Sequence, residues 1–232
     1  MTKIEIDDKF TKENGLPDLL RGLLYLPSGF KKERENSLLV YLHGAGERGC
    51  DISHITRHAI PKLIEEGREI GAVVYCPQCP ADFVWGNIVE KVKKSIDIIA
   101  NLYCADMSKI SITGSSMGGY GTSEMVMCYR NFFSRAAVVS GGGVPFRAQN
   151  MKGTKIRFYH GADDNLVTPE ESRRVFDVAA ANGCDCEYFL IGGKGHNEAI
   201  EYVYEKTDVT EWLLAGKRED FTRVPEFLEE LF

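Results

Sequence analysis

Short apolar runs alternate with longer helical patterns along most of the chain. The short runs are rich in β-branched and aromatic residues, which is typical of strands buried in a sheet. Predicted strands cover residues 3–6, 19–26, 37–43, 72–76, 110–113, 136–139, 156–160 and 187–191. Predicted helices cover residues 55–66, 88–102, 118–129, 169–181 and 198–214.

The order of these elements predicts an α/β fold. The first two strands, separated by the turn-rich residues 12–17, are expected to form a hairpin. After them, strands and helices alternate, which indicates right-handed crossovers and a mostly parallel central sheet with helices on both faces. Ligands bind at the carboxyl ends of the strands in such sheets. With 232 residues, 44% of them hydrophobic, the chain is expected to form a single domain over residues 1–232.

Charge and cysteine content narrow the classes of function. A net charge of −6 with no basic run argues against binding nucleic acid or an anionic membrane. No stretch resembles a secretion signal or a membrane span, so we expect a cytoplasmic protein. The seven cysteines are scattered and odd in number, so reduced thiols are expected, including Cys76 and Cys79 of a C-x-x-C pair.

A candidate nucleophile lies where a predicted strand meets a predicted helix. Gly114-Ser115-Ser116-Met117-Gly118 matches G-x-S-x-G, the pattern of a serine held on a sharp strand-to-helix turn. The flanking positions lack side chains so that neighbouring backbone can pass closely. The register selects Ser116, because a motif centred on Ser115 would need glycine at positions 113 and 117.

A serine nucleophile requires a histidine base and a carboxylate that orients it. His196 follows the last predicted strand in a glycine-rich loop and is the candidate base. Asp163 and Asp164 both follow the strand at residues 156–160, and the residues alone do not separate them. His54 and His58 have helical spacing but lack a third histidine, so no metal site is predicted.

Acyl transfer also requires donors for a developing oxyanion. The backbone N–H of Met117, just after the candidate nucleophile, is one candidate. Ala45 supplies the second, in the glycine-rich loop that follows the strand at residues 37–43. The alternative interpretation of this loop is a plain strand-to-helix connection.

The segments LLVYLHGAGERG, VVYCPQCP, ISITGSSMGGYGT, FYHGADDNLVTP and GGKGHNEA together resemble the α/β-hydrolase superfamily. Within it they are most similar to the phospholipase/carboxylesterase and dienelactone-hydrolase-like group, which includes predicted peptidases and feruloyl-type esterases. The resemblance implies an α/β-hydrolase fold with Ser116 at the elbow and Ala45 in the oxyanion hole. It also implies Asp164 as the acid, through an H-G-x-x-D-x-x-V pattern at residues 160–167, with Asp163 as the alternative.

The loops predict an open site. Only residues 141–154 lie between two consecutive predicted strands where many relatives carry a lid, so no cap domain is expected. Trp85 and Phe146 are candidates for stacking on substrate, with buried packing as the alternative for each. Glu47 and Leu166 are further candidates for substrate contact, although the favoured interpretation of Glu47 is a surface ion pair. Residues 217–232 carry apolar positions with helical spacing, which favours a helix docked on the domain over a partner-binding segment.

The predicted function is hydrolysis of small-molecule carboxylic esters with short or aromatic acyl groups, through an acyl-enzyme. The mechanism needs no cofactor. A peptidase of small peptides is the alternative within the same chemistry. A non-catalytic binding module with the same fold is the alternative of another class, because a fold alone does not establish a function.

Overall fold

The computed structural model describes residues 1–218, and these form one eight-stranded sheet in the order β1-β2-β4-β3-β5-β6-β7-β8. The strands are β1 (Thr2–Ile6), β2 (Gly22–Leu26), β3 (Asn36–Leu42), β4 (Val73–Pro77), β5 (Ala105–Ser115), β6 (Arg135–Val139), β7 (Lys155–Gly161) and β8 (Cys186–Ile191). β1 pairs with β2, and β2 with β4, in antiparallel register. The other pairs are parallel. The prediction of a mostly parallel α/β sheet that starts with a hairpin is therefore confirmed.

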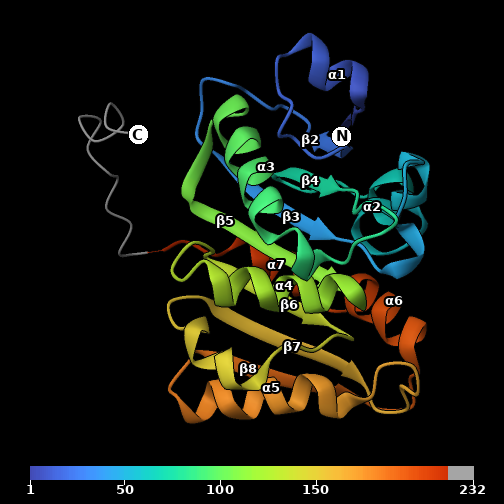
Figure 1. Cartoon of the computed structure of the whole chain (residues 1–232), viewed down its shortest axis with the longest axis vertical. Coiled ribbons are helices and arrows are strands. Elements are labelled where there is room, and N and C mark those ends of the chain that lie inside the picture. The colour runs from blue at the N-terminus through green and yellow to red at the C-terminus, as the bar shows by residue number, and fades with distance from the viewer. Residues whose placement is uncertain (219–232) are drawn as a thin grey trace.

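Helices cover both faces of this sheet (Figure 1). The α-helices are α1 (Asp8–Glu13), α2 (Ala59–Glu65), α3 (Val89–Leu102), α4 (Met117–Cys128), α5 (Pro169–Ala181), α6 (His196–Lys206) and α7 (Val209–Leu214). Short 3-10 helices are η1 (Ala45–Glu47), η2 (Ile52–Arg57), η3 (Trp85–Asn87) and η4 (Pro145–Met151). Buried residues of α3, α4 and α5 pack into one apolar cluster with the sheet. Buried residues of α2, α6 and α7 pack into a second.

The spacing of apolar residues explains which face of a helix is buried. In α3, Val92, Ile96 and Ile99 recur every three or four residues and are fully buried. In α6, Ile200, Val203 and Tyr204 follow the same spacing on the opposite side of the sheet. The Tyr204 hydroxyl lies 2.8 Å from Oγ1 of Thr113 on β5, so this buried polar group has a partner. Packing of this kind fixes the strand ends that carry the site.

Several predicted boundaries were wrong. The helix α1 was not predicted; it overlaps the predicted turn at residues 12–17 only at residues 12 and 13, and its N-cap Asp7 accepts from the backbone N–H of Phe10. The predicted helix at 55–66 is two helices, because Ala59 has a φ of 51°, which interrupts the helical backbone between η2 and the rest of α2. The predicted helix at 198–214 is interrupted between α6 and α7. The strand predicted from residue 19 starts at Gly22.

Between β6 and β7, the described chain carries only the short helix η4, as expected for a fold without a cap domain there. The apolar C-terminal positions Phe221, Val224, Phe227, Leu228 and Leu231 lie outside the described residues, so the predicted docked helix stays a prediction. Within residues 1–218, no helix has the length and apolar character needed to cross a membrane.

The connection between β5 and α4 lies directly against the end of β3. A Cβ built on Gly118 would overlap the carbonyl oxygen of Leu42, the last residue of β3. A Cβ on Gly114 would lie 2.7 Å from the same oxygen and would also overlap the carbonyl of Gly118. Only glycine at both positions lets the three backbone segments approach this closely. This close contact fixes the start of α4, where the candidate nucleophile lies.

Gly118→Ala is expected to lower the free energy of unfolding by about 2 kcal/mol or more, because the added methyl group has no space. The expected sign of this change in the free energy of unfolding is opposite to the usual one, because alanine normally favours a helix over glycine by roughly 1 kcal/mol. Urea unfolding of the two proteins measures the difference. Gly71→Ala is the control, because a Cβ there meets nothing within 4 Å. A Gly118→Ala variant as stable as the wild type would contradict the close contact.

Candidate active site

Ser116 occupies a strained turn between β5 and α4. Its backbone has φ 56° and ψ −119°, a region that residues with a Cβ rarely adopt. Its N–H donates to the carbonyl oxygen of Val139 on β6 at 2.9 Å, which ties the turn to the neighbouring strand. Ser116 lines two cavities at the carboxyl edge of the sheet. The side chain is therefore presented where a substrate can reach it.

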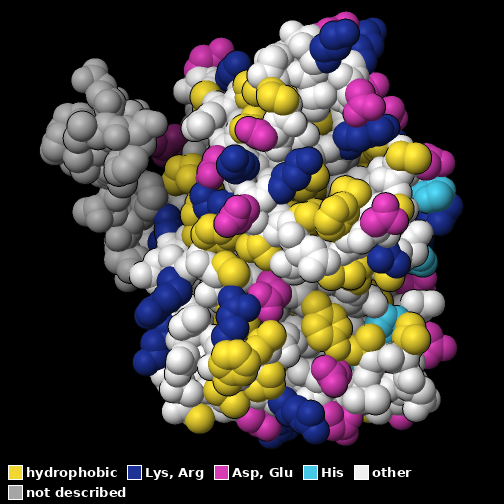
Figure 2. Space-filling model, viewed as in Figure 1, with side chains coloured by type: hydrophobic (Ala, Val, Ile, Leu, Met, Phe, Trp, Pro, Cys, Tyr) yellow, Lys and Arg dark blue, Asp and Glu magenta, His cyan; other side chains and the backbone are white. Residues whose placement is uncertain are grey.

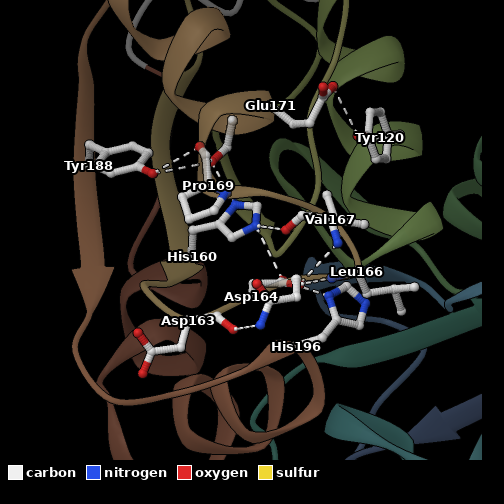
Figure 3. A network of polar contacts seen from close by, with 12 residues as sticks. Tyr120, His160, Asp163, Asp164, Leu166, Val167, Pro169, Glu171, Tyr188 and His196 are labelled. Carbon is white, nitrogen blue, oxygen red and sulfur yellow. Dashed lines mark hydrogen bonds and ion pairs between the residues drawn. The ribbon is translucent and has the colours of Figure 1, made fainter.

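Asp164 and His196 form a short hydrogen bond beside this serine. Nδ1 of His196 lies 2.6 Å from Oδ2 of Asp164, and the aspartate is only 2% exposed. The other oxygen of Asp164 accepts from the backbone N–H groups of Leu166 at 3.0 Å and Val167 at 2.9 Å. His160 approaches the same carboxylate, with Nε2 3.3 Å from Oδ2 (Figure 3). Both carboxylate oxygens are thus held in place.

Asp163 is oriented differently. Its carboxylate points away from His196, and its backbone carbonyl accepts from the side-chain amide of Asn165 at 3.1 Å (Figure 3). Of the two adjacent aspartates, Asp164 is therefore the one that faces the histidine. The structure thus distinguishes Asp164 from Asp163, which the residues alone do not.

His196 begins α6, so its ring is fixed by a helix start instead of a free loop. The N-cap residue Gly195 donates its N–H to Oε2 of Glu198 at 3.0 Å, which stabilises the first turn. Because Nδ1 is engaged by Asp164, Nε2 is the ring nitrogen left for chemistry. His196 and Ser116 line the same cavity.

Met117 and Ala45, the candidate oxyanion donors, hold equivalent positions in two helices. Met117 is the first residue of α4 and Ala45 is the first residue of η1. The N–H groups at a helix start have no acceptor within the helix, so they can serve a ligand. Met117 lines one of the two cavities at Ser116 and Ala45 lines the other. Both helix starts therefore lie at cavities that Ser116 lines.

His43 holds the loop that contains Ala45. Nδ1 lies 2.6 Å from the carbonyl oxygen of Gly44, and Nε2 accepts from the backbone N–H of Cys79 at 3.0 Å. A carbonyl only accepts, so these contacts require the proton on Nδ1 and a neutral ring. Burial lowers the pKa of His43 to about 4, which agrees with that state. Trp85 adds a hydrogen bond from Nε1 to the carbonyl of His43 at 2.9 Å.

The two cavities at Ser116 differ in character. One, of about 210 Å³, is called the polar cavity because it contains ionisable and amide side chains, although apolar atoms make up most of its surface; it is lined by Gly44, Ala45, Gly46, Glu47, His58, Ser115, Ser116, Leu166, His196, Asn197 and Ile200. The other, of about 390 Å³, is mostly apolar and is lined by Val84, Trp85, Gly86, Ser116, Met117, Tyr120, Glu124 and Val167. Ser116 is shared by both, whereas His196 lines only the polar cavity.

Apolar side chains remain exposed around these openings. Leu166 is 75% exposed, and Phe83 and Val84 are each more than 40% exposed. Figure 2 shows hydrophobic side chains beside histidine at the right-hand edge of the view, where the strands in Figure 1 end. Such a rim is suited to a substrate with apolar parts.

The four predicted substrate-contact residues have different outcomes in the structure. Glu47 is buried and lines the polar cavity, so the favoured interpretation of a surface ion pair was wrong. Trp85 is 1% exposed and packs edge-on against His43, which agrees with the packing alternative, although its edge lines the apolar cavity. Leu166 lines the polar cavity. Phe146 is 77% exposed and lines neither cavity, so neither stacking in the site nor buried packing describes it.

Tyr120, Asn197 and His160 also belong to the site, and none was singled out from the sequence. Tyr120 lines the apolar cavity and donates its hydroxyl to Oε2 of Glu171 at 3.1 Å. Asn197 lines the polar cavity next to His196. Tyr120 lies four residues after Ser116, one helical turn along α4, and this spacing is the signal that could have identified it.

No group of three or more His, Cys, Asp or Glu residues has the arrangement of a metal site in the part of the chain that the structure describes. His54 lies 3.3 Å from Asp51, and His58 faces Glu47 instead of His54. All seven cysteines are free thiols.

Comparison with known proteins identifies esterases that this chain resembles. No family model matches the chain. Carboxylesterase SOBER1 from Arabidopsis thaliana is 31% identical over 104 residues, which span 40% of this chain and 45% of that protein. The match thus covers less than half of that relative.

Solved structures resemble nearly the whole chain. A thermostable esterase superposes with a TM-score of 0.75 at 25% identity, covering 94% of this chain and 63% of the esterase. The feruloyl esterase module from Clostridium thermocellum, complexed with sinapinate, superposes with a TM-score of 0.67 at 13% identity, covering 87% and 85%. The chain has the α/β-hydrolase fold. The predicted resemblance to the phospholipase/carboxylesterase-like group is confirmed.

His43 is expected to stay neutral down to about pH 4, because its two hydrogen bonds and its burial oppose protonation. The unfolded imidazole titrates near pH 6.5, so the unfolded state gains protons first as the pH falls. Stability is therefore lost between pH 6.5 and 4, by up to about 3 kcal/mol from this group. NMR titration of the His43 ring measures its midpoint. A midpoint near 6.5 would contradict the buried neutral ring.

Proposed function

We propose that the protein is a serine carboxylesterase that cleaves esters of short or aromatic acids. The observation that carries the proposal is the hydrogen bond of 2.6 Å between His196 and Asp164, beside a serine held at φ 56° on the same cavity. This combination provides a nucleophile, a base and an orienting carboxylate. The likeness to esterases supports the same chemistry.

In the proposed mechanism, Nε2 of His196 removes the proton of the Ser116 hydroxyl while Oγ attacks the ester carbonyl carbon. Asp164 keeps the proton on Nδ1 of His196 and stabilises the imidazolium that forms. The carbonyl oxygen takes the negative charge and receives hydrogen bonds from the N–H groups of Met117 and Ala45. His196 then protonates the departing alcohol oxygen. A water molecule activated by His196 releases the acid from Ser116.

The two cavities suggest how the ester is oriented. The leaving oxygen has to lie within reach of His196, which protonates it. Because His196 lines only the polar cavity, the alcohol part belongs there. The acyl part then extends from Ser116 into the apolar cavity, along Met117 and Tyr120. A volume of about 390 Å³ suits a short chain or one aromatic ring.

Ser116→Ala is expected to abolish hydrolysis in a series of p-nitrophenyl esters from acetate to palmitate that also includes a feruloyl ester. Wild type should favour the short and aromatic acyl groups, because the apolar cavity is limited in volume. The release of p-nitrophenol measures both proteins. If the variant keeps wild-type rates, Ser116 is not the nucleophile. A wild type inert on every ester but active on small peptide amides would favour a peptidase.

Asp164→Asn is expected to lower kcat by roughly 10³–10⁴-fold, because an amide cannot hold His196 in the required tautomer and charge state. Asparagine keeps an oxygen for the N–H groups of Leu166 and Val167, so the loop should remain folded. Asp163→Asn is the matched control, since its carboxylate points away from His196 (Figure 3), and it should change kcat by less than about threefold. Equal losses in the two variants would contradict the assignment of Asp164.

A further inference from the structure

Glu47 is a buried carboxyl group without a hydrogen-bond partner on one oxygen. The residue is 5% exposed and lines the polar cavity together with Ser116 and His196. Its Oε2 is buried and makes no hydrogen bond. A buried acceptor without a partner is costly, so its presence in a cavity wall calls for an explanation. The proposed mechanism does not use this group.

Neither neighbouring histidine neutralises Glu47. His43 lies 3.8 Å from Oε2, but it is neutral, and its Nδ1 proton already goes to the carbonyl of Gly44. His58 lies 3.8 Å from Oε1, beyond hydrogen-bond distance, and its side chain is 43% exposed. Burial raises the pKa of Glu47 as a result. Because Oε2 has no exposed surface, the oxygen available to a group in the cavity is Oε1, which is also beyond hydrogen-bond distance of His58.

The carboxyl group also lies close to the reacting centre. A Cβ built on Gly44 would lie 3.3 Å from Oε2 of Glu47 and 3.7 Å from Cβ of Ser116. Glu47 and the serine thus flank the same glycine, in the loop that carries Ala45. A group bound to Glu47 would lie a few bonds from the scissile ester, on the side assigned to the alcohol.

The cavity wall carries further hydrogen-bonding groups beside Glu47. His58 and Asn197 line the same cavity and can hydrogen-bond further hydroxyls.

We propose that Glu47 makes the enzyme selective for esters of polyhydroxy alcohols, by accepting a hydrogen bond from a hydroxyl of the leaving group. The chemistry is that of glycerol or a sugar, each of which presents hydroxyls close to the esterified oxygen. This inference rests on the proposed esterase function and on the assignment of the polar cavity to the alcohol.

The test compares two esters of the acid that the p-nitrophenyl series favours. The n-propyl and glyceryl esters share one carbon skeleton and differ by two hydroxyls. Wild type should show a kcat/KM for the glyceryl ester about tenfold or more above that for the propyl ester. A 6-O-acyl glucose distinguishes a sugar from glycerol as the preferred alcohol.

Glu47→Leu should reduce the glyceryl-to-propyl ratio to about one, because the acceptor is lost. It should also raise the melting temperature, since an apolar side chain replaces an unpartnered carboxyl group. Glu47→Gln keeps the shape and one acceptor and should give an intermediate ratio, which provides a second readout if the leucine variant folds poorly. Glu65→Gln is the matched control, because Glu65 pairs with Lys3 and Tyr25 outside both cavities and should leave the ratio unchanged.

Each outcome has a distinct meaning. A wild type that cleaves both esters equally, or a ratio that survives both Glu47 variants, overturns this inference and leaves the esterase function intact. A preference for choline ester over its neutral analogue, the 3,3-dimethylbutyl ester, that depends on Glu47 would also overturn it, because the residue would then bind a cation. A wild type inactive on every ester overturns the proposed function and this inference together.

Discussion

The close contact between the first turn of α4 and the last residue of β3 is the constraint on which the site depends. Backbone meets backbone there, with Gly118 against the carbonyl of Leu42 and Gly114 between them. This one contact positions Ser116, the N–H of Met117 and the loop after β3 together. The backbone thus sets the distances between the parts of the candidate site, and the side chains fit within them.

Two buried histidines at strand ends each hold a loop of the candidate site by hydrogen bonds. His43, just after β3, bonds the loop that carries Ala45 and the start of the loop after β4. His160, near the end of β7, bonds the carbonyl of Val167 at 2.8 Å and approaches Asp164. Burial lowers the pKa of both rings, so neither carries charge at neutral pH. Neutral rings can join loops without the desolvation cost of a buried ion.

Sequence patterns predicted the order of strands and helices well, because periodicity and turn residues are local signals. They failed where tertiary packing decides, as at Ala59, whose positive φ splits a predicted helix. Motif spacing selected Ser116 and His196 as candidates, and the family resemblance favoured Asp164; the fold adds that Asp164 and not Asp163 faces the histidine. Burial is equally non-local, so the charged pattern around Glu47 suggested a surface residue and not a cavity wall.

The strained turn at Ser116 has a consequence for how this protein can change. A residue with a Cβ at φ 56° costs about 1–3 kcal/mol, and the surrounding sheet must offset it. In the proposed mechanism, fold stability and reactivity therefore oppose each other at one position, because a backbone that relaxed here would present the Ser116 hydroxyl differently. Related sequences under selection for stability alone would then be expected to replace this serine while keeping the surrounding fold.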